Sequence, residues 1–225
     1  MDFNQGIDAR LLTEEIIVQL SRIEIKPLRI AFDHADEKNV HIYKEAQWRA
    51  AKHGFKYLSN YVLFNFEDTP EELYFRLKIN IDLNERFKKE GLNTCIWSFP
   101  MKYSPFLGEH CRDRKYIGTH WNAKMLRGIQ CILSATHGVV GPKRKFFEHA
   151  FGNSYEEFEK IIYLPEHYII KRRESENLIT EWKDEYQELK DEERKEFIQL
   201  IKDNKFIDKK IENPKIRKLY QRYIV

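Results

Sequence analysis

The chain has 225 residues, 42% of them hydrophobic, and a net charge of only +3, so we expect one sizeable buried core with an appendage. Acidic and basic residues are mixed along the sequence, which argues against a nucleic acid partner because such partners require a concentrated basic face. No apolar run reaches the roughly 20 residues that span a bilayer, and the polar start lacks the basic region of a signal peptide, so the sequence predicts a cytoplasmic protein without a membrane partner.

The first hundred residues predict short strands that alternate with helices. Thr13 is a suitable N-cap for the first helix, because glutamates follow it in the first turn. The run Thr-Pro-Glu-Glu at 69–72 is a strong start for a later helix. The predicted strands lie at 2–8, 28–32, 57–66 and 94–99, the later helices at 42–52 and from 70 to before Gly91, and a turn at 100–105.

Beyond residue 106 the pattern becomes helical. Helices are predicted at 122–133 and 143–151, and Ser154 is a suitable N-cap for another. From residue 171 onward, apolar side chains at helical spacing predict two or three amphipathic helices. Their acids nearly match their bases, which favours solvated helix faces over a nucleic-acid-binding stripe.

Polar residues follow each of the three later strands. Asp33 and His34 end the first, 65–68 ends the second, and 102–104 ends the third. Strands alternating with helices indicate parallel βα units, whose ligands bind at the carboxyl ends of the strands. A ligand site is therefore predicted there, with Asp33 favoured as a functional residue, although Asp33 and Asp68 also suit turn or capping roles.

Three cysteines occur, at Cys95, Cys111 and Cys131. Their odd number and wide spacing argue against a disulfide framework and indicate a reducing compartment. The spacing fits neither a zinc ribbon nor a cluster-binding run, so we interpret them as ordinary thiols and predict no metal ligand.

Four segments, in this order and spacing, resemble the radical S-adenosylmethionine (radical SAM) superfamily, in the branch that includes methylthiotransferase-like barrels. They read FNQGIDARLLTEE at 3–15, LRIAFD at 28–33, YVLFNFEDTPEE at 61–72 and WSFPMKYSP at 97–105. They look like the third to sixth strands of that barrel with the turns that follow them. Residues 116–170 also resemble an extension found in some uncharacterised members.

The resemblance implies an α/β fold: an incomplete (β/α)6 partial TIM barrel of the radical SAM type with a mostly helical C-terminal extension. The partial barrel would comprise residues 1–108, the helical extension 109–170 and an amphipathic helical tail 171–225. The implied cofactor is S-adenosyl-L-methionine (SAM).

The resemblance also implies the residues that would position SAM. Asp33 would face its ribose or methionine part, Asn4 or Arg10 would lie near its carboxylate, and Asn65 and Phe66 would place backbone against the adenine. His34 is a further candidate because it adjoins Asp33 at a strand end. No catalytic residue is assigned.

The sequence departs from the family at its defining motif. The family holds a [4Fe–4S] cluster with C-x3-C-x2-C, which this sequence lacks, and without three thiolates the cluster cannot be held. The cluster half, about 60 residues or more, is expected to precede the third strand. Asn65 replaces the family's glycine and Asp33 its glutamate. The resemblance therefore implies the C-terminal part of an enzyme of 5′-deoxyadenosyl radical chemistry, inactive alone.

Two other functions remain open. The chain is alternatively a non-catalytic protein-binding module that pairs, through an open strand edge near residues 2–8, with an N-terminal half or a partner chain carrying the cluster. A weaker alternative is an RNA-binding helper, based on the basic and aromatic segments 143–147 and 215–223.

Overall fold

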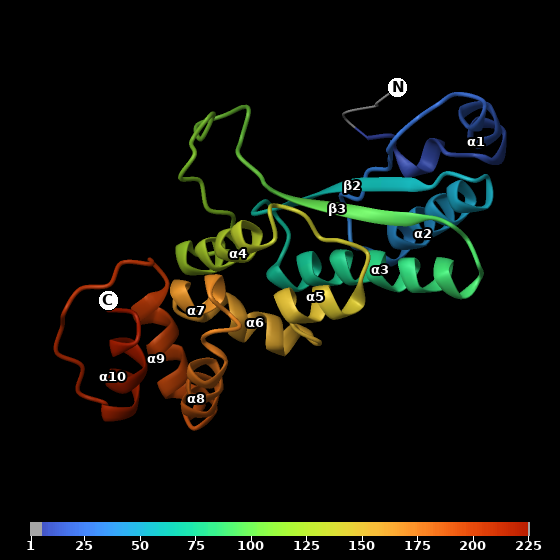
Figure 1. Cartoon of the computed structure of the whole chain (residues 1–225). Helices are drawn as coiled ribbons and strands as arrows, with labels where there is room; N and C mark the ends of the chain where they lie inside the picture. The colour runs from blue at the N-terminus through green and yellow to red at the C-terminus, as the bar shows by residue number, and fades with distance from the viewer. Residues whose placement is uncertain (1–5, 225) are drawn as a thin grey trace.

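The computed structural model describes residues 6–224 as an α/β structure with a small parallel sheet and about ten helices (Figure 1). The strands are β1 (Leu28–Arg29), β2 (Tyr57–Phe64) and β3 (Cys95–Lys102). The helices are the short 3₁₀ helix η1 (Ala9–Leu11), α1 (Glu14–Ser21), α2 (Glu37–Lys52), α3 (Pro70–Lys89), α4 (Ala123–Ala135), α5 (Arg144–Phe151), α6 (Tyr155–Tyr163), α7 (Glu166–Ile170), α8 (Glu176–Gln187), α9 (Asp191–Ile201) and α10 (Pro214–Gln221).

The three strands are parallel and lie in the order β1-β2-β3, so strands that follow one another in the chain are neighbours in the sheet. Ile7 extends this arrangement with a parallel bridge to Ile30 on the far side of β1. The strand predicted at 2–8 is therefore represented by one bridge among the described residues. The predicted α/β class is confirmed, and the parallel βα units are present.

Helices cover one face of the sheet. Figure 1 shows α2 and α3 along the same side of β2 and β3. Buried apolar side chains from α1, β1, α2 and the start of β2, with the later part of α3 and the start of β3, form one cluster, here called the sheet core. The opposite face, here called the open face, comprises Tyr57, Tyr61, Leu63, Trp97, Phe99 and Met101.

The open face keeps large apolar side chains in contact with solvent. Trp97 is 40% exposed and Met101 46% exposed. Arg29 from β1 lies over the rings of Tyr61 and Phe99, 5.1 and 5.8 Å from their centroids. Within residues 6–224, no helix covers these side chains.

A second cluster, here called the helical core, comprises buried apolar side chains from the end of β2, from α3 and from α4 to α10. The helix α3 belongs to both clusters: Ile79, Leu83 and Phe87 face the sheet core, whereas Leu73 and Leu77 face the helical core. The helical core extends without interruption across residues 108 and 170.

Buried polar side chains on one side of α3 form hydrogen bonds that attach this helix to the sheet. Arg76, Asn80 and Asn84 are spaced by four residues and share one side of the helix. Asn80 Nδ2 donates to Ser98 Oγ at 2.8 Å, and Asn84 Oδ1 accepts from the backbone N–H of Ile96 at 2.7 Å. These bonds satisfy polar groups that burial would otherwise leave unpaired.

Local signals in the sequence are confirmed where they depend on nearby groups. Thr69 and Glu72 form the reciprocal capping box of α3, with Pro70 at its first position. Thr13 caps α1 through the Ile16 N–H, and Gly54 takes the left-handed φ of +84° after α2.

The turn predicted from Pro100 was wrong, because β3 continues through Pro100 to Lys102. The N–H groups of Cys95 and Tyr103 donate to carbonyls of the β2 side, whereas that of Ser98 donates to Val140 on the opposite edge. Pro100 is in phase with Ser98, so its missing N–H removes no bond to β2.

The C-terminal helices pack as the amphipathic pattern predicts. Trp182 and Phe197 are completely buried, and Trp182 stacks on Tyr186 with ring centroids 4.9 Å apart. Pro214 begins α10, as its lack of an N–H allows. Of the helices in the described part of the chain, none is both long and apolar enough to cross a membrane.

Candidate functional site

A cavity of about 430 Å³ lies at the carboxyl ends of the strands, between the segment after β1, the turn after β2 and the start of α3. Asp33 and His34 line it from the segment after β1, Phe66 from the turn after β2, and Tyr103 from the end of β3. This cavity, here called the edge cavity, therefore gathers three of the predicted SAM-binding residues from two different turns. Its volume is within the range of small-molecule sites, roughly 300–1,000 Å³.

Arg76 fixes the wall of the edge cavity. It is 1% exposed, and its guanidinium donates to Leu63 O at 2.8 Å and to Asp68 Oδ2 at 3.0 Å. It also reaches the carbonyls of Phe32 and Asp33 at 3.4 and 3.5 Å. One side chain thus ties the ends of β1 and β2 to α3.

Asp68 shapes the turn after β2. Its Oδ1 accepts the backbone N–H of Phe66 at 2.9 Å, so Asp68 has the turn role that the sequence also allowed, while Thr69 caps α3. Burial raises the pKa of this carboxyl, while the Phe66 N–H and Arg76 act in the opposite direction. Because both oxygens are engaged, Asp68 supports the cavity rather than offering an acceptor to a ligand.

The side chains that remain open to a ligand are acidic and aromatic. Asp33 and Glu67 line the edge cavity, and neither carboxylate forms an ion pair or hydrogen bond among residues 6–224. The rings of Phe66 and Tyr103 lie 4.6 Å apart at 53°. The lining therefore suits a ligand that carries positive charge, hydroxyl donors and a flat apolar group.

Asn65 does not line the edge cavity. It is fully buried with φ +74°, and its amide accepts from Gly118 N–H at 2.8 Å and donates to the carbonyls of Tyr103 and Tyr116. A Cβ on Gly118 would lie 2.4 Å from Phe66 O, so this glycine packs directly on the turn. Asn65 thus anchors the loop that follows β3.

The other predicted SAM contacts lie outside the edge cavity. Arg10 is an exposed residue whose guanidinium forms three hydrogen bonds with Asp8 of its own turn. Asn4 lies outside the described residues. The structure therefore groups Asp33, His34 and Phe66 and leaves Arg10 apart.

The cysteines do not form a metal site. Cys95 begins β3, Cys111 lies exposed in the loop after β3, and Cys131 is buried in α4. Among the described residues, no group of three or more His, Cys, Asp and Glu side chains could hold a metal ion. The residues present do not fit a [4Fe–4S] cluster.

Sequence reasoning did not select Tyr103 and Arg76, which both line the edge cavity. Tyr103 was noted only as part of a polar strand end, and Arg76 was not singled out. The spacing of Arg76, Asn80 and Asn84 by four was an available signal, because polar residues repeating on the side of a helix that also carries apolar residues indicate buried hydrogen bonds.

Comparison of the chain with protein-family models, with curated proteins and with solved structures finds no match.

Proposed function

We propose that this chain is the SAM-positioning and substrate-side part of a radical SAM enzyme, with the edge cavity as its SAM site. The observation that carries the proposal is the convergence of Asp33, His34 and Phe66 on one cavity at the carboxyl ends of consecutive parallel strands. Ligands of parallel α/β proteins bind at this end of the sheet.

The arrangement of the sheet supports a partial barrel. Strands in sequential order with helices on a single face are the arrangement of a (β/α) barrel wall, whereas a doubly wound sheet carries helices on both faces. In this proposal the open face is the inner wall of an incomplete barrel. Its aromatic residues and Arg29 then face the substrate.

The chemistry of the edge cavity suits SAM. The sulfonium and ammonium groups of SAM are cationic, and Asp33 and Glu67 offer carboxylates without a protein partner among the described residues. A carboxylate also accepts hydrogen bonds from the ribose hydroxyls. The rings of Phe66 and Tyr103 offer faces to adenine or to the sulfonium.

The cluster has to come from elsewhere in this proposal. No cysteine of the chain lies in a C-x3-C-x2-C run, so we assign no radical step to any residue here. The chain by itself holds and orients SAM without cleaving it. An N-terminal half or a cluster-bearing partner chain supplies the iron–sulfur chemistry.

The binding test is calorimetric titration of the full chain with SAM. We expect SAM to bind more tightly than S-adenosylhomocysteine, which lacks the sulfonium charge. Asp33→Asn and Phe66→Ala should each weaken SAM binding about tenfold, the effect of one lost charge-assisted hydrogen bond or one stacked ring. Asp208→Asn, in an exposed loop near the C-terminus, is the matched control. SAM binding that neither site variant changes would refute the assignment.

A second candidate is the protein-binding module. The open face favours it, because contiguous exposed apolar side chains mark interaction sites. SAM titration, combined with anaerobic reconstitution with iron and sulfide in the presence and absence of a cluster-bearing partner, distinguishes the two. The radical SAM proposal expects the visible absorbance of a cluster only when a cluster-bearing partner is added, together with SAM binding. A partner that binds while SAM does not would favour the module.

A further inference from the structure

A second and larger cavity, of about 900 Å³, lies on the other side of the sheet's carboxyl end, along α4. Its walls come from the end of β3, the loop at 114–117 and the turn at 203–205. Lys102 lines it, whereas the next residue, Tyr103, lines the edge cavity. The two cavities are therefore separate sites that share a strand.

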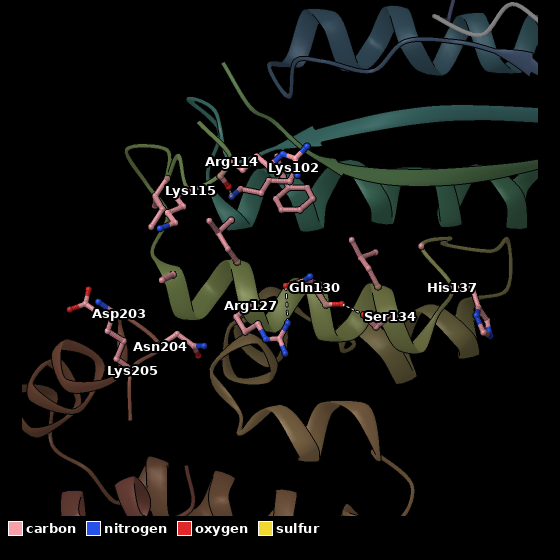
Figure 2. Close-up of a pocket in the computed structure, with 16 residues that line it drawn as sticks. Lys102, Arg114, Lys115, Arg127, Gln130, Ser134, His137, Asp203, Asn204 and Lys205 are labelled. Carbon is pink, nitrogen blue, oxygen red and sulfur yellow. Dashed lines mark hydrogen bonds between the residues drawn. The ribbon is translucent and has the colours of Figure 1, made fainter. Parts of the chain in front are cut away.

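Positive charge dominates this second cavity. Figure 2 shows Lys102, Arg114 and Lys115 on one side of α4, with Asp203, Asn204 and Lys205 beyond its amino-terminal end. Asp203 is the one carboxylate among the described lining residues. We call this site the basic cavity.

Most of these cations have no acidic partner. Lys102, Arg114, Lys115 and Lys205 form no ion pair within residues 6–224, and Lys102 Nζ donates only to the carbonyl of Arg114 at 3.1 Å. Arg127 differs, because Glu166 neutralises it at 2.6 Å. Like charges that converge without counterions attract an anion.

The rest of the lining is apolar and polar rather than charged. Leu126 and Leu133 line the cavity from α4, and Ile117 lines it from the loop. Asn204 Oδ1 is buried and accepts no hydrogen bond from the described residues. Asn204 Nδ2 donates a hydrogen bond to Glu166 Oε1. An anion with an apolar body and a hydroxyl or amino donor would satisfy both features.

We propose that the basic cavity binds a phosphorylated organic molecule of nucleotide size, with its phosphates between Lys115 and Lys205 and its organic part along α4. Phosphate oxygens accept charge-assisted hydrogen bonds from Lys and Arg, which accounts for cations on both walls. This site takes a ligand distinct from SAM and is independent of the proposed function.

Single-stranded RNA is a poorer occupant. Proteins that bind single strands combine cations with exposed aromatic rings on which bases stack. Phe64 is the one aromatic ring among the described lining residues, apart from the imidazole of His137, and it is 3% exposed. A compact ligand therefore fits the basic cavity better than a stacked strand.

The experiment is calorimetric titration of the full chain with adenosine diphosphate, inorganic pyrophosphate, adenosine and a short oligouridine. We expect adenosine diphosphate to bind most tightly, pyrophosphate more weakly and adenosine least. The double variant Lys115→Gln/Lys205→Gln should weaken adenosine diphosphate binding about tenfold or more, as expected for lost charged hydrogen bonds. Lys89→Gln, an exposed lysine at the opposite end of α3, should leave it unchanged.

A second variant tests the organic part of the ligand without a change of charge. Ser134 is exposed on α4 and lines the basic cavity, so Ser134→Trp fills space there without disturbing the core. It should weaken binding of adenosine diphosphate more than binding of pyrophosphate. Absence of phosphate-ligand binding, or binding that the double variant leaves intact, overturns the proposal. Oligouridine binding much tighter than adenosine diphosphate binding overturns it in favour of a nucleic acid surface.

Discussion

The two hydrophobic cores of this chain differ in how completely they are enclosed. The helical core is surrounded by α3 and by α4 to α10, and its largest fully buried side chain, Trp182, has no contact with solvent. The sheet core is covered by helices on one face only, and the open face leaves Trp97 40% exposed. This difference indicates that the C-terminal helices stabilise the chain, whereas the open face and the edge cavity are available for binding.

Two tryptophans give the sharpest test of this difference. Trp182→Ala should lower the free energy of unfolding by about 3–5 kcal/mol, because it leaves a large cavity in a closed core. Trp97→Ala should lower it by about 1 kcal/mol or less, as for a surface position. Equilibrium unfolding in urea measures both. Equal losses at the two positions would show that the open face is covered in solution.

Arg76 tests how the two regions are joined at the site. Arg76→Met should cost about 3 kcal/mol of unfolding free energy, because it leaves the Asp68 carboxylate buried without its partner. Arg76→Lys should not restore the loss, since a single ammonium cannot reach carbonyls of both strands and Asp68 at once.

Lys78→Met, which removes a charge from the same helix, is the control for Arg76 and should change stability by no more than about 0.5 kcal/mol. Calorimetric titration then separates folding from binding. At a temperature where Arg76→Met remains folded, its affinity for SAM should fall, because the wall of the edge cavity loses its attachment to β1. Unchanged affinity would contradict the positioning role of Arg76.

The close approach of α4 to α6 tests the closed region itself. A Cβ on Gly128 would lie 2.2 Å from Ile162 O, which is too close for any side chain. Gly128→Ala should therefore cost about 2 kcal/mol through overpacking, although alanine is the better helix former by about 1 kcal/mol. Thermal unfolding shows whether Gly128→Ala lowers or raises the stability of the protein. Ser134→Ala, on the exposed side of α4, should leave stability within about 0.5 kcal/mol.

How far the sequence predicted this structure depended on the range of each interaction. Thr69 and Glu72 interact within one turn, so the start of α3 was predictable from four residues. Pro100 was misjudged because its tolerance in β3 depends on the pairing with β2, which leaves the Pro100 nitrogen on the opposite edge of the strand. The pairing partner of an edge is set by tertiary structure and leaves no local pattern.

The candidate site, too, was predictable only in the part that follows from local sequence pattern. The polar strand ends predicted where Asp33 and Phe66 would meet, because parallel strands end at a common edge. Asn65 also lies at a strand end, yet its side-chain amide is already hydrogen-bonded to Gly118 and to the loop after β3. The basic cavity needed β3, α4 and the turn at 203–205 together, so no single segment of the sequence indicated it.

The smallest predicted effect concerns Lys124, a charged group inside the closed region. Its ammonium is completely buried and donates to the carbonyls of Ile162 and Leu164 at 3.2 and 2.7 Å. Burial lowers the pKa of Lys124 from 10.5 to about 8, with Cys131 and Glu166 acting in the opposite direction.

Because the folded pKa of Lys124 lies below that of the unfolded chain, the unfolded chain binds more protons between pH 8 and 10.5. The wild-type protein should therefore gain about 1 kcal/mol relative to Lys124→Met between pH 7 and pH 9, and the difference should be flat below pH 7. Urea unfolding of both proteins at each pH measures this, and subtraction cancels the groups that titrate alike in the two. Parallel profiles across this range would mean that water reaches Lys124 and that the helical core is less closed than the sheet core.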